Sequence, residues 1–393
     1  MKLFATAATV GFLTAMCANA QITGRTPPAP ILGVTFDDDL ANSGDKPAMQ
    51  GLVHTPTSRV VIDPGVSAGT YKSRMSALSP YTYWMVELVD SSYMAGDSQS
   101  TVQSLTNSMV SGIGNTADLW EIGNEVNGNW LSHESNGADV MPKIEYMYNT
   151  VAAAGGKTVL TFFYEGEPSD PNNCIAIDHG GNDMFTWIAT NFTNAPTTQT
   201  EAIRTGVNYV GISWYPDQCP GENPNWGAVF TKLAGIFPNA QVGFTELGTA
   251  NPENGSAFEQ NEISTYYPMQ AGVGGLPANY FGGYFWWYFA EEYKVVTPWI
   301  NAAVGGGAVT ESVSVTLSAS PASISPRQSS TLTYASQDAA SCTATGFTVS
   351  GLTGSAKVSP SATTTYSIVC TGTTGGTATA KATVTVSTHN RRG

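Results

Sequence analysis

The sequence predicts an α/β fold: a (β/α)8 barrel followed by a small all-β sandwich. Strand-like and helix-like segments alternate over residues 24–303, and the chain beyond residue 312 is rich in Ser, Thr and Ala with short alternating strands. Repeated strand–helix units imply a parallel sheet, and eight such units favour closure into a barrel. A doubly wound open sheet is the alternative. It would not by itself place polar and aromatic residues at the ends of units four, six, seven and eight.

Residues 1–20 have the pattern of a secretory signal peptide. Lys2 is followed by an apolar run from Leu3 to Leu13, and Ala18-Asn19-Ala20 forms a small-residue cleavage site. The run is too short to span a bilayer. Met16 disfavours lipidation of Cys17, because a lipoprotein signal would have a small residue there. We therefore expect a soluble protein secreted to the extracellular space or the periplasm.

Eight strand-like segments follow, each apolar and rich in β-branched or aromatic residues. They are 31–36, 58–62, 81–89, 119–123, 158–164, 207–215, 241–246 and 280–287. The second is bounded by the turn Asp63-Pro64-Gly65, and the fifth is introduced by Gly155-Gly156. Helix-like segments between them are 98–110, 141–153, 185–192, 226–236 and 258–269.

Two strand-end glutamates occur in matching sequence context. The fourth strand leads into Asn124-Glu125, and the seventh ends at Glu246. A lone Asn-Glu pair is more often a solvated loop, but two strand-end glutamates would meet at the same end of a barrel. Glycoside hydrolysis needs two carboxyl groups flanking one bond, so this pair predicts a catalytic site.

The Asn124-Glu125 and Glu246 motifs, in this order and at this separation, resemble the clan A glycoside hydrolases over about residues 30–300. The resemblance implies a TIM barrel and a retaining mechanism, with Glu125 as acid/base, Glu246 as nucleophile and Asn124 bonding the sugar 2-hydroxyl. It implies no cofactor. The substrate would be a β-linked polysaccharide, a β-glucan or a related cell-wall glycan, cleaved in endo fashion.

The same resemblance assigns further substrate-site residues. Tyr215, at the end of strand six, would orient the nucleophile, and Arg59 on strand two would lie near it. Strand eight ends in Trp286-Trp287, whose side chains face opposite ways, and we expect Trp287 to line the site. Trp214 could pack in the core or stack on sugar. We count it with the aromatic residues that indicate an open groove for a polymer.

Four cysteines remain after the signal, an even number that suggests disulfides in an exported protein. Three pairings are possible; local pairing predicts Cys174–Cys219 and Cys342–Cys370. We expect no metal site, because there is no C-x-x-C motif and the four histidines are scattered. A calcium site at Asp37-Asp38-Asp39 is the weaker alternative, since the glycine and terminal glutamate of an EF-hand are missing.

Residues 304–311 form a Gly-rich linker, and residues 312–388 predict a β-sandwich with strands near 313–317, 331–334, 365–369 and 378–386. These segments resemble the bacterial immunoglobulin-like modules that follow many secreted hydrolases, with Cys342–Cys370 bridging two strands. All nine tryptophans lie at or before Trp299. A spacer or attachment module is therefore favoured over a polysaccharide-binding one, because sugars stack on exposed aromatic faces.

The formal charge is −14, and it becomes −14 − 1 = −15 when Lys2 leaves with the signal. Basic residues form no dense run, which argues against nucleic acid as a partner. We expect a monomer whose partner is its glycan substrate, with no membrane association. Two alternatives remain: a barrel that binds glycan at the cell surface without catalysis, and a transglycosylating enzyme. Both glutamates are present, which disfavours the first; product analysis would separate the second.

Overall fold

The computed structural model describes residues 21–37, 39–131, 137–168, 173–174, 183–250, 256–305, 314–337, 339, 341–371 and 377–387. The predicted signal peptide and most of the predicted linker lie outside the described residues. The chain divides into two compact units. The first comprises residues 1–45, 55–250 and 270–287, and the second comprises residues 46–54, 251–269 and 288–393. The domain limits drawn from the sequence stay a prediction.

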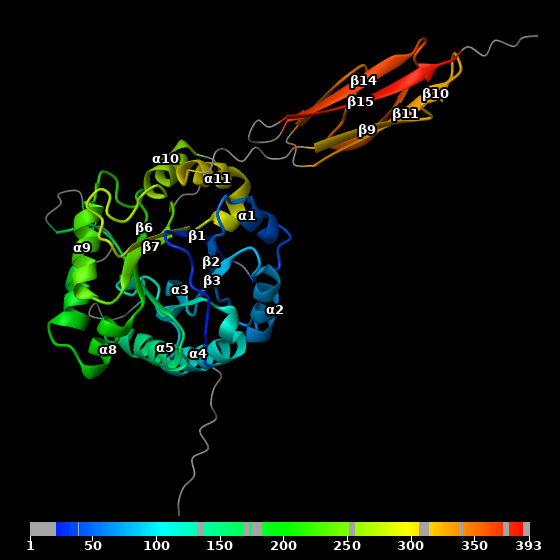
Figure 1. Ribbon diagram of the computed structural model, residues 1–393. Helices are drawn as coiled ribbons and strands as arrows, with labels where there is room; N and C mark the ends of the chain where they lie inside the picture. The colour runs from blue at the N-terminus through cyan, green and yellow to red at the C-terminus, as the bar shows by residue number, and fades with distance from the viewer. Residues whose placement is uncertain are drawn as a thin grey trace, which may run out of the picture. The chain divides into compact units, whose positions relative to one another are not determined.

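The first unit is built on a closed barrel of eight parallel strands (Figure 1). The strands are β1 (Ile31–Phe36), β2 (Thr57–Val61), β3 (Tyr83–Glu87), β4 (Leu119–Glu121), β5 (Thr158–Phe163), β6 (Tyr209–Trp214), β7 (Gln241–Leu247) and β8 (Tyr280–Trp286). Each pairs with the next, and β8 pairs with β1. The predicted (β/α)8 barrel is confirmed, and every predicted strand segment overlaps an observed one.

Helices connect the strands and surround them in Figure 1. Those of the first unit are α2 (Ala68–Leu78), α3 (Ser91–Met94), α4 (Gln99–Ile113), α5 (Met141–Ala153), α7 (Met184–Ile188), α8 (Thr198–Gly206) and α9 (Trp226–Ile236). Short turns lie at η1 (Gly114–Thr116), η2 (Asn129–Leu131) and η3 (Ala189–Thr193). Several helices begin at a residue whose side chain accepts a hydrogen bond from a backbone N–H group, such as Ser67 at α2 and Asn225 at α9. The predicted helix 185–192 is α7 running into the π turn η3.

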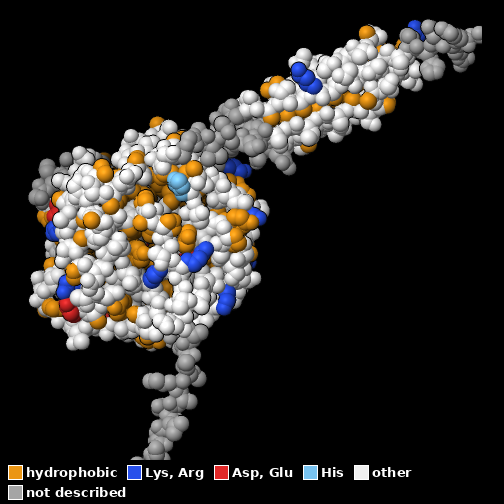
Figure 2. Space-filling view, in the orientation of Figure 1, with side chains coloured by type: hydrophobic (Ala, Val, Ile, Leu, Met, Phe, Trp, Pro, Cys, Tyr) orange, Lys and Arg blue, Asp and Glu red, His pale blue; other side chains and the backbone are white. Residues whose placement is uncertain are grey.

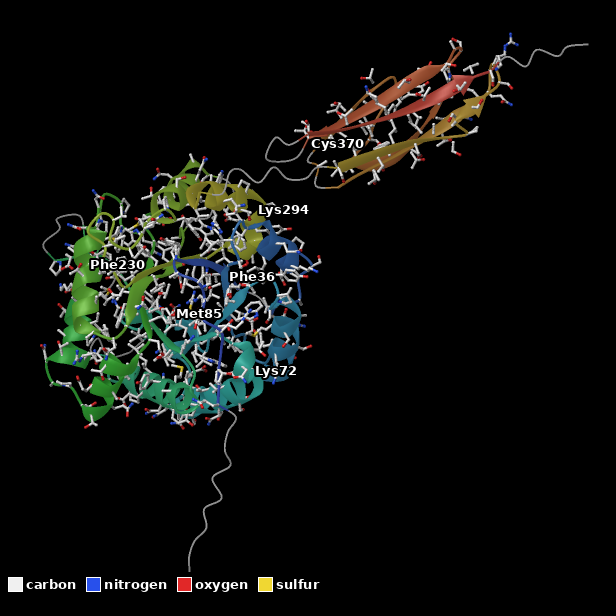
Figure 3. The ribbon with its side chains drawn as sticks, in the orientation of Figure 1. Phe36, Lys72, Met85, Phe230, Lys294 and Cys370 are labelled. Atoms are coloured by element: carbon white, nitrogen blue, oxygen red, sulfur yellow. A yellow bond between two sulfur atoms is a disulfide. The ribbon has the colours of Figure 1, made fainter. Side chains whose placement is uncertain are left out.

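The inside of the barrel is apolar at one end and polar at the other. An apolar cluster fills it near the strand starts, and Figure 3 labels one member, Met85. Its buried residues are Ile31, Met85, Leu119, Val159, Phe281 and Phe285. Charged side chains occur later along the strands, among them Arg59, Glu87 and Glu246. The carboxyl ends of the strands therefore hold the groups able to do chemistry, as in other (β/α)8 barrels.

β8 departs from regular strand geometry in its middle. Gly282, Gly283, Tyr284 and Phe285 all have positive φ, between 43° and 96°. A Cβ at Gly283 would lie 1.8 Å from the carbonyl oxygen of Phe244, so only glycine fits there. The pairing register of β8 shifts against both β1 and β7 at this bulge. The bulge thereby sets where the two tryptophans that follow it are presented.

The second unit contains α10 (Ala257–Tyr266), α11 (Phe289–Ala303), an all-β region and α1 (Asp45–Gly51). The first residue of α1, Asp45, is assigned to the first unit. The Asn301 side chain of α11 accepts a hydrogen bond from Val53 N and donates one to Gly51 O, which ties α11 to the end of α1. Within the described ranges, no helix combines the length and apolar character needed to cross a bilayer. Figure 2 shows Lys and Arg side chains scattered over the visible face of the molecule.

The all-β region has two sheets, with strand orders β10-β15-β14-β12 and β13-β11-β9. The strands are β9 (Ser314–Ser320), β10 (Ser323–Ile324), β11 (Ser330–Gln337), β12 (Ser341–Thr345), β13 (Thr353–Val358), β14 (Thr364–Thr371) and β15 (Thr377–Val386). Leu332, Tyr366 and Val384 pack in its core. The predicted all-β character is confirmed, whereas its likeness to immunoglobulin modules stays a prediction. The Cys342–Cys370 disulfide joins paired residues of β12 and β14 in one sheet, unlike the inter-sheet disulfide of antibody domains.

Candidate active site

Glu125 lies just after β4 in a left-handed backbone conformation, with φ of 48°. Residues other than glycine seldom adopt this conformation, which costs about 1–3 kcal/mol and is enriched at active sites. The side chain is 7% exposed. Ser213 on β6 donates to Oε1 at 2.7 Å, and Ser91 at the start of α3 donates to Oε2 at 3.0 Å. Glu125 is thus fixed by groups from two other parts of the barrel rim.

The environment of Glu125 favours its neutral form. Burial, and next the charge of Glu246, raise the pKa of Glu125 to about 8, although the hydrogen bonds from Ser213 and Ser91 act in the opposite direction. The carboxyl group therefore carries a proton at neutral pH. A buried acid that keeps its proton at neutral pH is suited to act as a general acid.

Glu246, near the end of β7, accepts hydrogen bonds on both oxygens. Tyr215 Oη donates to Oε1 at 2.6 Å, and Arg59 Nη1 donates to Oε2 at 2.7 Å. Burial, and then the charges of Glu246 and Glu125, raise the pKa of Tyr215 well above its ordinary value, so the phenol stays a neutral donor. The two carboxyl groups of the site therefore have contrasting partners: a cation and a phenol hold Glu246, whereas two serine hydroxyl groups hold Glu125.

Arg59 is the centre of a buried ionic network. Its Nε donates to Glu121 at 2.7 Å, and its Nη2 lies 3.0 Å from Glu87 Oε2. Thr161 on β5 donates a further hydrogen bond to Glu121. The third nitrogen of Arg59 binds Glu246, so one guanidinium links strands β2, β3, β4 and β7. A planar guanidinium with several carboxylate partners has little freedom to rotate.

The sequence reasoning missed Glu87 and Glu121, which complete this network. Each is the last residue of a strand whose other described residues are mostly apolar and buried, β3 and β4. A glutamate inside an apolar strand is a signal that could have identified them, because charged residues are rarely fully buried unless paired. Ser91 and Ser213, the partners of Glu125, were also missed as site residues.

The structure distinguishes the predicted aromatic residues. Trp287 is partly exposed, and the Arg59 guanidinium lies 5.3 Å from the centre of its ring. Trp286 is only 1% exposed, and its buried side chain has no face for substrate. Trp287 follows the last residue of β8, and its role in lining the site stays a prediction.

Trp214 does not fit the predicted contact with substrate. It is 1% exposed and packs against Tyr164 and Trp226, with ring centres 5.7 and 5.5 Å away. Its neighbour Ser213 reaches Glu125 inside the barrel, so alternation along β6 directs Trp214 outward among the helices. The same outer aromatic cluster includes Phe230 of α9, labelled in Figure 3.

Asn124 precedes Glu125 and is 1% exposed. Its side-chain Oδ1 has no hydrogen-bond partner among the residues that the structure describes. A buried amide oxygen of this kind costs free energy unless a partner binds it. The predicted bond from Asn124 to a substrate hydroxyl would supply one.

Both predicted disulfides are present, Cys174–Cys219 and Cys342–Cys370. The first joins the loop after β5 to the loop after β6, beside the carboxyl ends of these strands. Two disulfides fit an oxidising compartment outside the cytosol. Asp38, which belongs to the alternative calcium site, lies outside the described residues. Within the described part of the chain, no cluster of three or more His, Cys, Asp or Glu side chains is arranged to hold a metal ion.

No protein-family model and no curated protein matches the chain. Solved structures do match it. An endo-β-1,4-mannanase from Thermotoga petrophila shares 11% identity, covers 91% of this chain and 98% of its own, and superposes with a TM-score of 0.42. An FMN-binding β-glucuronidase from Faecalibacterium prausnitzii L2-6 shares 11% identity, with 94% and 58% of the chains covered and a TM-score of 0.43.

Saccharomyces cerevisiae Gas2p, in complex with laminaritriose and laminaritetraose, shares 16% identity with this chain. The match covers 66% of this chain and 56% of Gas2p, with a TM-score of 0.38.

Proposed function

We propose that the barrel is a retaining endo-β-glycosidase that hydrolyses a β-linked polysaccharide by double displacement. The observation that supports this proposal is that the two glutamates at the carboxyl ends of β4 and β7 have contrasting environments. Glu125 keeps a proton at neutral pH, and Glu246 is held through both oxygens by Arg59 and Tyr215. Two carboxyl groups in contrasting environments are the arrangement that assigns an acid and a nucleophile in glycosidases.

In the first step, Glu246 attacks the anomeric carbon while Glu125 donates its proton to the departing glycosidic oxygen. A glycosyl ester forms on Glu246, and the leaving sugar departs as an alcohol. The ester carries no negative charge, so the charge that helps to raise the pKa of Glu125 is lost at that point. Glu125, now ionised, becomes a suitable base to deprotonate the water that releases the sugar and regenerates Glu246.

Three further side chains would assist this chemistry. Asn124 would donate or accept a hydrogen bond at the sugar 2-hydroxyl, an interaction that strengthens as positive charge develops on the ring. Tyr215 would hold the attacking oxygens of Glu246 in place, and the partly exposed Trp287 would support the sugar ring. The proposed substrate is a β-glucan or a related cell-wall glycan, and the proposed site of action is outside the cytoplasm. Water is the only co-reactant that these steps use.

The test is a reducing-sugar and product screen of the mature protein on β-glucans, galactan, mannan and xylan. Glu125→Gln and Glu246→Gln are compared with Glu201→Gln, a change on the outer helix α8. We expect activity on one polymer, lost in both site variants and kept in the control, with the first product in the β configuration by NMR. A first product of inverted configuration would exclude the double displacement. Activity that survives Glu246→Gln would exclude Glu246 as nucleophile.

A substrate of unknown identity need not be in the panel, so a second probe accompanies it. A set of 2-deoxy-2-fluoro-β-glycosides with activated leaving groups would trap the glycosyl ester, and mass spectrometry of peptides would locate it. We expect the label on Glu246. No hydrolysis on any polymer together with no labelling by any sugar of the set would contradict the proposal.

A further inference from the structure

The Arg59 network holds three carboxyl groups and one cation, all buried. Arg59, Glu87 and Glu121 are fully buried, and Glu246 is nearly so. If all three carboxyl groups were ionised, two negative charges would remain unbalanced by the guanidinium. Burying an unbalanced charge is costly, and such groups usually bind a proton instead.

The hydrogen bonds show which carboxyl group is least supported as an anion. Glu121 accepts hydrogen bonds from Arg59 Nε and from Thr161, and Glu246 accepts them from Arg59 Nη1 and Tyr215. Glu87 has an ion-pair contact with Arg59 Nη2, and neither of its oxygens has a hydrogen-bond partner among the described residues. Hydrogen bonds to a carboxylate favour its charged form, so the proton belongs on Glu87.

The charges around Glu87 act in the same direction. Among the described residues, Arg59 on β2 is the cation that acts on it, whereas Glu121 on β4, Asp90 after β3 and Glu246 on β7 are all acidic. Burial raises the pKa of Glu87 well above its ordinary value, Arg59 opposes the rise, and the three acidic neighbours add to it. Burial also raises the pKa of Glu121, against the hydrogen bonds and charge of Arg59.

We propose that Glu87 is a positioning residue that contacts Arg59 as a neutral acid and orients the guanidinium toward Glu246. A neutral Glu87 fixes the plane of the Arg59 guanidinium through its contact with Nη2. The positive charge of Arg59 then stabilises the two ionised carboxylates, Glu121 and Glu246. Glu87 acts through Arg59, because it is fully buried and contacts that guanidinium. The effect on catalysis rests on the function proposed above; the protonation state does not.

The first test measures stability and needs no activity. Glu87→Gln copies the shape and charge of the neutral acid. In the wild type, a raised pKa means that the unfolded chain loses its Glu87 proton above about pH 4.3 while the folded chain keeps it, so stability falls as pH rises. The variant lacks this loss. We therefore expect the Tm of the variant minus that of the wild type to become more positive between pH 4.5 and pH 8.

A difference in Tm that is flat over this range, or becomes more negative as pH rises, would overturn the neutral state of Glu87. The second result would mean that Glu87 is ionised and stabilised by Arg59. This series is read on the full chain and remains informative even if the protein proves not to be a glycosidase.

The second test measures the positioning role by steady-state kinetics. Glu87→Leu is compared with Glu87→Gln on a substrate that the wild type hydrolyses. We expect Glu87→Gln to keep kcat within about threefold, and Glu87→Leu to lower kcat by about tenfold or more with little change in KM. A Leu variant as active as the wild type, or a Gln variant as impaired as Leu, would overturn the role. A Leu variant that does not fold leaves the Gln variant and its Tm series to decide. Absence of wild-type glycosidase activity would instead count against the proposed function.

Discussion

The hydroxyl group of Tyr215 donates a 2.6 Å hydrogen bond to Oε1 of Glu246, across the neighbouring strands β6 and β7. The phenol is a reliable donor because burial and the nearby carboxylates raise its pKa well above the ordinary value. Arg59 binds the other oxygen. The carboxyl group therefore cannot rotate without breaking a bond to a neutral donor or to a cation.

We predict that Tyr215→Phe lowers kcat/KM by about tenfold to a hundredfold, because a hydrogen bond to a charged group contributes about 1.5–3 kcal/mol. Steady-state kinetics on the hydrolysed polymer measures the effect. Tyr209→Phe is the matched control, since Tyr209 lies at the start of β6 and packs beside the apolar cluster inside the barrel. Equal losses in the two variants would mean that the phenol acts through folding alone.

The pKa of Glu125 predicts an alkaline limit of activity. Glu125 must be protonated to act as an acid, and its pKa of about 8 keeps it protonated at lower pH. We predict that kcat/KM on polysaccharide falls as pH rises above about 8. A dinitrophenyl glycoside, whose leaving group needs no proton, serves as comparison, and its glycosylation rate should show no such fall. The same alkaline fall with both substrates would assign it to another group.

The serines that bind Glu125 should shift this limit. Their hydrogen bonds lower the pKa of Glu125, so Ser213→Ala removes a lowering effect. We predict that its alkaline limit moves to higher pH than in the wild type, and that Ser91→Ala, which loses the longer bond, moves it in the same direction by less. The pH profile of kcat/KM measures both shifts. A limit that moves to lower pH would contradict the assignment of the acid.

The sequence was sufficient to predict the barrel and the residues that follow its strands. The apolar β-branched strands are distinct, and Glu125 and Glu246 were singled out because both lie at strand ends and together supply the two carboxyl groups that glycoside hydrolysis needs. The apolar strand β3 marks Glu87 as unusual in the sequence, but its partner Arg59 lies on another strand, β2, and the partner of Ser91 lies after β4. Such contacts depend on closure and register, which no local pattern encodes.

Helices were harder to predict than strands. α2 buries only Ala68, Tyr71 and Met75 among its residues, so its apolar periodicity is weak; a helix was expected after the second strand, but without bounds. Trp214 was counted with the substrate site because it lies at the end of β6, where residues of a substrate site are expected. Which face of β6 looks inward became clear only from the contact of Ser213 with Glu125.

Trp214 and Trp287 should respond differently to truncation. Trp214 is buried among aromatic rings, so Trp214→Ala is expected to lower the free energy of unfolding by about 3–5 kcal/mol. Trp287→Ala removes a partly exposed ring, and we expect a smaller loss of stability with a raised KM or a lowered kcat. Denaturant unfolding and kinetics on both variants measure the contrast. Unchanged kinetics in a stable Trp287→Ala protein would exclude this ring from the substrate site.

The Cys342–Cys370 disulfide should stabilise the all-β region without affecting catalysis. It closes a sequence separation of 28 residues and joins β12 to β14, and removing a native disulfide from a small domain costs about 2–5 kcal/mol. Every candidate site residue belongs to the other unit. We predict that a variant with both cysteines replaced by serine unfolds its all-β region at lower temperature in calorimetry but keeps wild-type kcat/KM.

The matched control replaces Cys174 and Cys219, at the barrel rim, by serine. This variant should instead lower the unfolding temperature of the barrel. A loss of activity in the Cys342/Cys370 variant at a temperature where both regions remain folded would show that the all-β region contributes to catalysis.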